Sequence, residues 1–472
     1  MRWNALGRLG SVSACLLLAL SCRERAKPKQ DFPTEPVVSG EIDPNDLVPR
    51  EGAGGAAAAP VEGVPRCRVV SGSGFLLGSR GKEELGSEEP VDVPFAVDLG
   101  NALLESGGFV VGALVPQGKT VEARAVWLPS DAKRAVVSSF GVVQGGGPAP
   151  ALTLNSGMVL AAILDSNSSG KILQLASVAT PSAEPVVRLG AAISVSRDDS
   201  DAFSLATAGA QSLLVWDDLD KKPKPHSVIR AVLLTPANLD KPGKPFQISP
   251  PFLDVEAPRL LSRGDGYWLV WSKSEGTANA HPKAELTQAD AGVPEEVPWV
   301  DTEMRTLQAV MLSAEGKPQG KPVEILPPVA KALSYECSVD GAGGIVVVFR
   351  EEAGLGNDPP HLGVVRLALD GSVVRRSFAT PAAPGLPDLL VDPEQKPASL
   401  WLAIGDEGSE LRLSPLGPEF KEPEFVKEPA LGRTRVLAVK GARFLSAEPK
   451  GQAIELRTLD CQAPTPQGGT KK

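Results

Sequence analysis

The sequence predicts an all-β fold, and three observations support this class. Short apolar segments alternate with polar positions at a period of two, which is typical of strands rather than helices. The 48 glycines and 44 prolines interrupt most segments that could otherwise form a helix. A glycine-containing turn followed by an apolar strand recurs between residues 66 and 461. Such recurrence indicates one sheet unit repeated many times.

The repeated turn-and-strand segment predicts the architecture. Its copies are Gly107–Leu114, Ser156–Ile163, Gly209–Trp216, Gly264–Trp271, Gly343–Phe349, Pro397–Ile404 and Gly441–Ser446. A second alternating strand follows most copies, as in Thr306–Leu312. Units of ~40–75 residues have the size of a propeller blade, so we expect a β-propeller of about seven four-stranded blades. A pair of β-sandwich domains in tandem is the alternative. The ring is favoured because no break in composition separates the units.

The two ends of the repeat region predict how the ring closes. A segment containing Cys67 precedes the first full unit, and the last unit, which ends at Cys461, is one strand short. An N-terminal strand that completes the last blade would bring these two cysteines together. We therefore expect a Cys67–Cys461 disulfide, which an exported protein permits and which contributes up to ~5 kcal/mol for so long a loop. Cys337 is the odd cysteine, and its pairing with either of the others stays open.

The first 21 residues have the pattern of a secretory signal. Arg2 and Arg8 precede an apolar segment, Val12–Leu20, which is shorter than the ~20 residues needed to span a bilayer. The segment Leu18–Cys22 that follows resembles the lipobox of bacterial lipoproteins. This resemblance implies cleavage before Cys22, a diacylglyceryl thioether on its sulfur and acylation, for example by palmitate. An ordinary cleaved signal with an incidental cysteine is the alternative. Because Arg23 replaces the aspartate of inner-membrane lipoproteins, the resemblance implies anchoring in the outer membrane.

Composition divides the rest of the chain. Residues 22–65 are rich in proline, glycine and alanine without apolar periodicity, so we expect a disordered tether. Residues 66–461 form the predicted propeller, and residues 462–472 form a polar tail that we expect to be disordered. The formal net charge of −9 argues against a nucleic-acid partner, because few cations are left to neutralise phosphates.

The sequence contains no recognisable catalytic or metal site. The three histidines, His226, His281 and His361, each lie near a proline and lack a second ligand at metal-binding spacing. No Gly-x-Ser-x-Gly motif is present, and the acidic segment 197–201 lacks the glycine and closing glutamate of a calcium loop. We therefore expect no metal, no cofactor and no catalytic residue.

Two aromatic residues are candidates for contact with a partner. Tyr267 lies on a repeated strand, and Trp299 is the only aromatic anchor in Glu275–Glu303, a polar segment that interrupts a hairpin. Long segments of this kind are often disordered or functional. Trp268 and Trp271, on the same repeated strand as Tyr267, are expected to pack between blades.

These features favour a membrane-anchored, monomeric lipoprotein of the cell envelope that binds an unknown protein or glycan partner without catalysis. One alternative is a propeller hydrolase or lyase acting on envelope or extracellular glycans, and another is a structural envelope protein. Carboxylates clustered with arginine or histidine at the central channel would favour the enzyme. An apolar channel, or one with scattered charges, would favour binding.

Overall fold

The structure is a computed structural model of the chain and divides into two units, Met1–Pro60 and Val61–Lys472. The described residues all belong to the second unit. They lie between 66 and 462, with gaps at 71–73, 79–97, 106–107, 118–119, 130–134, 145–146, 168–169, 180–184, 197–200, 222–224, 252, 278–302, 327–331, 352–360, 380–387, 393–398, 406–410, 417–425, 429–433, 442 and 451–452. The predicted signal, Cys22, the tether and the tail 463–472 therefore lie outside the described residues.

Seven antiparallel sheets make up this unit, six with four strands and one with five. In each sheet the first strand of the repeat lies at one edge. These edge strands are β3 (Asp98–Glu105), β7 (Ala151–Asn155), β11 (Phe203–Ala208), β15 (Val255–Ser262), β19 (Ala332–Val339), β23 (Asp388–Asp392) and β27 (Arg435–Lys440).

The next strands of each sheet follow in chain order. The second strands are β4 (Gly108–Gln117), β8 (Met158–Asn167), β12 (Gln211–Asp220), β16 (Gly266–Thr277), β20 (Ile345–Glu351), β24 (Ser399–Gly405) and β28 (Arg443–Lys450). The third strands are β5 (Thr120–Pro129), β9 (Gly170–Ala179), β13 (His226–Leu234), β17 (Glu303–Ser313), β21 (His361–Leu367), β25 (Leu411–Leu416) and β29 (Ala453–Gln462). The fourth strands are β6 (Val136–Val143), β10 (Val187–Val195), β14 (Phe246–Gln247), β18 (Val323–Glu324), β22 (Val373–Ala379) and β26 (Val426–Glu428).

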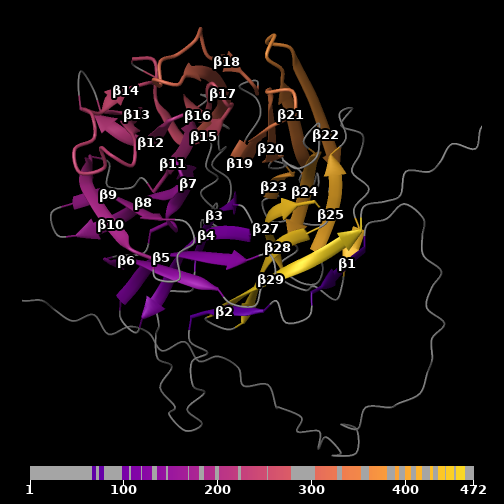
Figure 1. The fold of residues 1–472 in the computed structure, drawn as a ribbon. Coiled ribbons are helices and arrows are strands. Elements are labelled where there is room, and N and C mark those ends of the chain that lie inside the picture. Colours follow the sequence, from indigo (N-terminus) through magenta and orange to yellow (C-terminus); the bar gives the residue numbers. More distant parts are fainter. Residues whose placement is uncertain are drawn as a thin grey trace, which may run out of the picture. The chain divides into compact units, whose positions relative to one another are not determined.

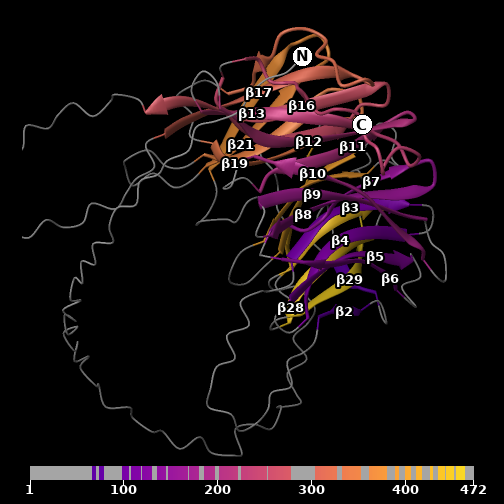
Figure 2. The same ribbon diagram turned by 90° about the vertical axis from the view of Figure 1, so that its left-hand side faces the viewer.

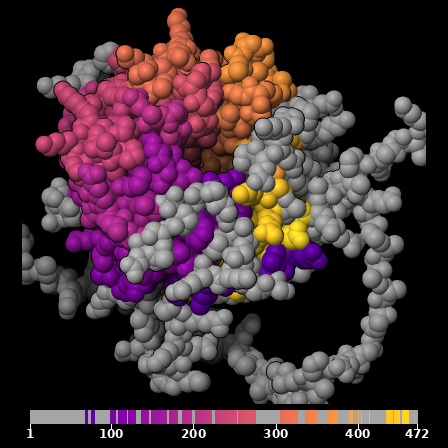
Figure 3. Space-filling view, viewed as in Figure 1, coloured from indigo at the N-terminus to yellow at the C-terminus, as the bar shows by residue number. Residues whose placement is uncertain are grey.

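The seven edge strands form a closed ring. Strand β3 contacts β7, each following edge strand contacts the next, and β27 contacts β3. Figure 1 shows these strands around the centre, with β6, β10, β22 and β1 (Arg66–Val69) towards the outside. Figure 2 shows the sheets of β4, β9, β12 and β16 in succession. Figure 3 shows the same face as Figure 1, and its colours follow the chain around that face. The closed ring confirms the predicted β-propeller and excludes tandem sandwiches.

Apolar clusters fill the interfaces between neighbouring sheets. On β8, Val159 and Ala161 face the sheet of β3–β6, whereas Leu160 and Ala162 face the sheet of β11–β14. This division follows from the pleat of a strand, which points successive side chains to opposite faces. A cluster of this kind lies at each of the seven interfaces of the described unit. Both faces of a sheet are thus buried, which explains the continuous apolar runs of the repeat.

The glycines of the repeat occupy the turns between first and second strands. Gly157, Gly209 and Gly264 have φ values of 75°, 59° and 90°, a region that favours glycine because it has no Cβ. The interrupted hairpin is also confirmed, because β16 and β17 pair as far as Thr277 and Glu303 on either side of residues 278–302. Trp268 and Trp271 are buried between sheets as predicted.

Strands from both ends of the chain complete the last sheet. Strands β1 and β2 (Phe75–Leu77) pair antiparallel with successive parts of β29, and the register places Cys67 opposite Cys461. A disulfide joins these two cysteines, as predicted, and Cys337 is a free, buried thiol. The closing sheet therefore has five strands instead of the predicted four, because the N-terminal segment pairs as two short strands. The described part of the chain contains no helix that is long and apolar enough to cross a membrane.

Candidate functional site in the central channel

A cavity of 550 Å³ lies where the edge strands surround the centre of the ring. Residues on, or directly before, each of the seven edge strands line it. Small-molecule sites usually have volumes of ~300–1,000 Å³, so this cavity has the size of such a site. Its charged lining residues are Asp201, Arg259, Glu336, Asp388 and Arg435.

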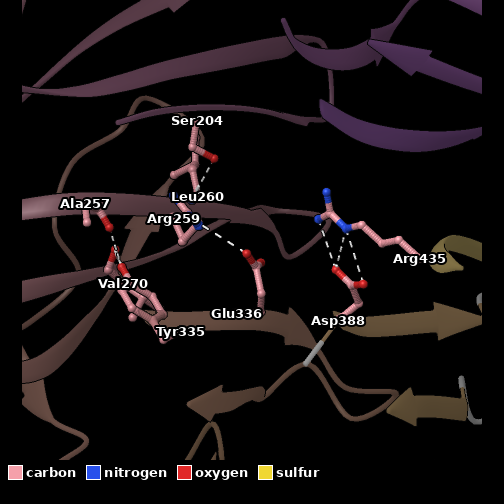
Figure 4. A network of polar contacts seen from close by, with 9 residues as sticks. All are labelled: Ser204, Ala257, Arg259, Leu260, Val270, Tyr335, Glu336, Asp388 and Arg435. Carbon is pink, nitrogen blue, oxygen red and sulfur yellow. Dashed lines mark hydrogen bonds and ion pairs between the residues drawn. The ribbon is translucent and has the colours of Figure 1, made fainter. Parts of the chain in front are cut away.

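Four of these charges come from four consecutive edge strands. Arg259 lies on β15, Glu336 on β19, Asp388 on β23 and Arg435 on β27, so two carboxylates lie between two guanidinium groups (Figure 4). Asp201, which precedes β11, accepts a hydrogen bond of 2.8 Å from the ammonium group of Lys171. The charges that the sequence distributes over hundreds of residues therefore meet in one cavity.

Asp388 and Arg435 form a closed ion pair. The Arg435 Nε donates to Asp388 Oδ1 at 3.0 Å and to Oδ2 at 3.3 Å, and Arg435 Nη2 lies 3.0 Å from Oδ1. Burial raises the pKa of Asp388 even though the neighbouring guanidinium opposes the shift. Burial would lower the pKa of Arg435, but the carboxylates of Asp388, Glu336 and Asp98 outweigh it and raise that pKa. Each side chain thus stabilises the charged form of the other.

Arg259 and Glu336 form an open ion pair. Arg259 Nη2 lies 3.8 Å from Glu336 Oε1, beyond hydrogen-bond distance, and neither side chain makes a hydrogen bond to another described residue. Burial raises the pKa of Glu336, the nearby Asp388 adds to the shift, and the two arginines oppose it. For Arg259, burial acts to lower the pKa, but Glu336 and other nearby groups overcome this effect and raise it. The donors and acceptors of this pair remain available in the cavity.

A β-bulge positions Arg259. The pairing of β15 with β16 shifts register between Glu256 and Arg259, and Ala257 has a φ of 52°, in the left-handed region. The Tyr335 hydroxyl donates to the carbonyl oxygen of Ala257 and, at 3.2 Å, to that of Val270. Because a bulge redirects the side chains beside it, this local irregularity directs Arg259 into the channel.

Residues of the two neighbouring edge strands, β11 and β19, also contact the bulged segment. The amide of Leu260 donates to the Ser204 hydroxyl at 3.0 Å, and the guanidinium carbon of Arg259 lies 5.8 Å from the centre of the Tyr335 ring. The latter distance permits a cation–π interaction. Figure 4 shows Ser204 and Tyr335 near Arg259, with the Leu260–Ser204 hydrogen bond as a dashed line.

The remaining reactive group of the channel is Cys337, next to Glu336 on β19. Burial raises the pKa of this thiol far above its usual value, and Glu336 adds to the effect. The thiol is therefore protonated at neutral pH and is a poor nucleophile. Within the described ranges, no three His, Cys, Asp or Glu side chains come together in a way that could hold a metal ion.

The prediction that Tyr267 contacts a partner is wrong. Its side chain is 0% exposed within a core cluster between two sheets, and its hydroxyl donates to the carbonyl oxygen of Gln211 at 2.8 Å. Burial raises the pKa of Tyr267 to about 12. His226 and His361 begin strands β13 and β21, so they are not the loop residues that their neighbouring prolines indicate.

Other predicted residues lie away from the channel or beyond the described residues. Cys67 and Cys461 join the outermost pair of strands of the closing sheet. Trp299 lies in the gap 278–302. The four channel charges were missed because each strand carries only one or two charged residues among apolar ones, and no local motif links them. The signal that could have found them is the recurrence of a charge on the first strand of successive repeats, as in Pro258–Leu260 and Tyr335–Cys337.

The chain has no match among protein-family models and none among curated proteins. Among solved structures, an ulvan lyase of polysaccharide lyase family PL25 is similar, with a TM-score of 0.50 and 11% identity over 76% of this chain and 93% of the lyase. The β-propeller domain of the trilobed protease from Pyrococcus furiosus has a TM-score of 0.43 and 12% identity over 79% of this chain and 97% of the domain. The polysaccharide lyase Uly1 has a TM-score of 0.46 and 7% identity over 84% and 99%. At such identities the likeness shows the fold alone.

Proposed function

We propose that this chain is a lipid-anchored protein of the cell envelope, held in the outer membrane, whose propeller binds a protein or glycan partner without transforming it. The anchor is supported by the resemblance of Leu18–Cys22 to a lipobox and by the tether-like composition of residues 22–65. The binding role is supported by a polar cavity that all seven edge strands line.

The observation that carries the binding role is the pairing of charges in the channel. Asp388 accepts hydrogen bonds from Arg435 through both carboxylate oxygens, and Glu336 has Arg259 as its ion-pair partner. A general base must be free to accept a proton, and a nucleophile must be activated by such a base. Compensated charges and a protonated thiol suit recognition of a polar ligand better than bond cleavage.

The anchor is tested by replacing Cys22. We expect Cys22→Ser to abolish incorporation of labelled palmitate and to release the protein from the membrane fraction, because the sulfur is the proposed attachment point. Cys15→Ser, within the same apolar segment, is the matched control and leaves labelling unchanged. Labelled, membrane-bound Cys22→Ser protein would refute the anchor.

The binding role is tested by capture on the immobilised full chain. Solubilised envelope material is applied, and retained protein and carbohydrate are quantified and their masses compared with the input. We expect retention with unchanged mass, and at least tenfold less retention on Arg259→Gln. The control is Arg68→Gln, which removes an exposed ion pair with Asp460 far from the channel wall. Retention no greater than on an unrelated propeller would reject the binding role.

A glycan lyase or hydrolase is the second candidate. It is favoured by the convergence of two carboxylates and two arginines in the channel, and by the similarity in fold to an ulvan lyase. In uronate elimination an arginine such as Arg259 would neutralise the sugar carboxylate, and Glu336 would have to act as the base. Tyr335 is the alternative candidate for the base, but its hydroxyl is hydrogen-bonded to two backbone carbonyl oxygens.

The enzyme is tested by incubation with ulvan and other uronate polysaccharides while ultraviolet absorbance follows unsaturated product. We expect no product above that of Glu336→Gln. If the wild type forms unsaturated product and Glu336→Gln does not, the protein is a lyase and the proposal of binding without catalysis is refuted.

A further inference from the structure

The open ion pair differs from other arginine–carboxylate pairs in the described unit. Arg366 Nε lies 2.6 Å from Asp340 Oδ2, and Arg230 Nε lies 2.8 Å from Asp218 Oδ2. Arg259 and Glu336 remain 3.8 Å apart, although both side chains line the same cavity. Polar groups inside proteins usually have hydrogen-bond partners. Among the described residues, neither the five donors of this guanidinium nor the two oxygens of the carboxylate beside it have a hydrogen-bond partner.

The exposure of these two side chains shows that a ligand can reach them. The side chain of Arg259 is 35% exposed and that of Glu336 is 30% exposed, and the surface that they expose faces the cavity. The guanidinium is held from behind by the Tyr335 ring and by the bulge of β15. The pair is thus fixed in position before a ligand arrives, which lowers the entropy cost of binding.

Charge compensation restricts what the ligand can be. Arg259 is the ion-pair partner of Glu336, and the second carboxylate, Asp388, lies on the next edge strand. A simple anion that engaged Arg259 would take from Glu336 the guanidinium that is its ion-pair partner, while Asp388 still repels it, which is costly in a partly enclosed site. A simple cation on Glu336 would leave Arg259 uncompensated in the same way. A ligand that carries both charges side by side satisfies both groups.

We propose that the open pair is a receptor for the head group of a free α-amino acid. The ligand carboxylate accepts two hydrogen bonds from the Arg259 guanidinium, and the ligand ammonium donates to Glu336, with Asp388 adding attraction from the neighbouring strand. Hydrogen bonds between such ions have lengths of ~2.7–2.9 Å, so the carboxylate and ammonium of one α-carbon can contact both side chains across the open pair. This proposal rests on the binding role proposed above.

The rest of the cavity provides room for a side chain. Its walls include Leu99, Leu260 and Leu390 beside the polar Asn101. Asn101 is engaged with the backbone of Leu152 through both its amide nitrogen and its oxygen. The cavity lining thus combines leucine side chains with an amide whose polar groups are already engaged, and an uncharged ligand side chain fits such a lining best.

The test is calorimetric titration of the purified full chain with each of the twenty standard amino acids at neutral pH. For the tightest binder, three matched probes follow: its decarboxylated amine, its deaminated acid and a dipeptide with the same N-terminal residue. We expect at least one amino acid to bind, and each of the three probes to bind at least tenfold more weakly. The dipeptide separates a free amino acid from the end of a peptide chain.

Variants identify the site. We expect Glu336→Gln and Arg259→Gln each to lower the affinity for the tightest-binding amino acid at least tenfold, whereas Arg68→Gln leaves that affinity unchanged. Thermal unfolding of each variant establishes that the propeller is still folded. The inference is overturned if no amino acid binds the wild type, if the amine or the acid binds as tightly as the amino acid, or if Glu336→Gln binds normally. If envelope material is still retained in the capture experiment, the binding role then stands without the amino-acid receptor. If neither envelope material is retained nor an amino acid binds, both proposals are refuted.

Discussion

Tyr335 determines where Arg259 lies. Its hydroxyl bonds two backbone carbonyls around the bulge, of Ala257 and Val270, while its ring supports the guanidinium. Burial raises the pKa of Tyr335 well above its usual value, so the hydroxyl remains a neutral donor at physiological pH. One buried side chain thus links the packing of two sheets to the geometry of the channel.

Replacing Tyr335 separates this positioning role from general stability. We expect Tyr335→Phe to lower the free energy of unfolding by about 1–3 kcal/mol, because two buried carbonyls lose a donor. It should also weaken binding in the channel several-fold, measured by the titration described above. The control is Tyr267→Phe, which removes a buried hydroxyl bond to Gln211. It should cost comparable stability in urea unfolding and leave channel binding unchanged. Equal effects of both variants on binding would contradict the positioning role.

Glu336 should make stability depend on pH. Its pKa in the folded protein is raised above the ordinary value of 4.5, chiefly by burial. Below pH 4.5 the carboxyl is protonated in both the folded and the unfolded state and has no effect. As the pH rises from 4.5 towards the raised pKa, the unfolded state loses its proton first, so the folded state becomes relatively less stable. We expect the melting temperature of the wild type to fall relative to that of Glu336→Gln over this interval.

The control for this pH dependence is Glu315, whose pKa is shifted in the opposite direction. The Ser313 hydroxyl donates to its carboxylate at 2.8 Å and lowers the pKa of Glu315. The stability from this group is therefore present above 4.5 and is lost as the pH falls through the lowered pKa. Relative to Glu315→Gln, the wild type should gain stability as the pH rises. If the difference in melting temperature between the wild type and Glu336→Gln stays the same from pH 4 to pH 7, the raised pKa assigned to Glu336 is contradicted.

At the scale of the element, bulges shape the strands that form the channel wall. Edge strands β3, β15, β19 and β27 each carry a register shift in their pairing, next to residues that line the channel. A regular strand would point alternate side chains into the two neighbouring sheet interfaces. The bulges locally break that rule beside Arg259, Glu336 and Arg435, whereas Asp388 lies on β23, which pairs without a register shift.

The elements also approach one another closely at one glycine, Gly112 on β4. A Cβ at this position would lie 2.3 Å from the carbonyl oxygen of Pro150, the residue before β7. We expect Gly112→Ala to lower the free energy of unfolding by about 1–3 kcal/mol, because backbone of the next sheet must move. The control is Gly243→Ala, whose Cβ would meet no atom within 4 Å. That change should be neutral or slightly stabilising in chemical unfolding. Equal stability of the two variants would show that the sheets separate easily.

The sequence predicted the elements well and the site poorly, for one physical reason. Strand repeats are encoded locally by turns such as Gly264 and by alternation, and the short last unit predicted the partner of Cys67. The channel depends instead on the radial position of single residues such as Glu336. That position follows from ring closure and from bulges, which alternation along a single strand does not encode, so only a comparison of first strands between repeats carries a signal. For the same reason Tyr267 was misplaced, since sequence alone does not separate an aromatic residue in an interface from one on a surface.

At the scale of the whole described unit, closure is the step that creates the cavity. The channel requires the contact between β27 and β3, and the sheet of β27 is completed by strands β1 and β2 from the other end of the chain. The segments that pair there are separated by most of the sequence, so their association is entropically expensive. A crosslink at this position therefore acts on the folding of the entire ring.

The Cys67–Cys461 disulfide should consequently carry much of the stability of the closed ring. The cysteines are 394 residues apart, and the chain-entropy model gives an upper contribution of about 5–6 kcal/mol for a loop of this length. We expect the double variant Cys67→Ser/Cys461→Ser to unfold at much lower urea concentration than the wild type under oxidising conditions. Under reducing conditions the two should unfold at similar concentrations. Cys337→Ser is the control, because this free thiol should leave the sensitivity to reductant unchanged. A wild type whose unfolding midpoint does not respond to complete reduction would mean that the apolar interfaces alone hold the ring closed.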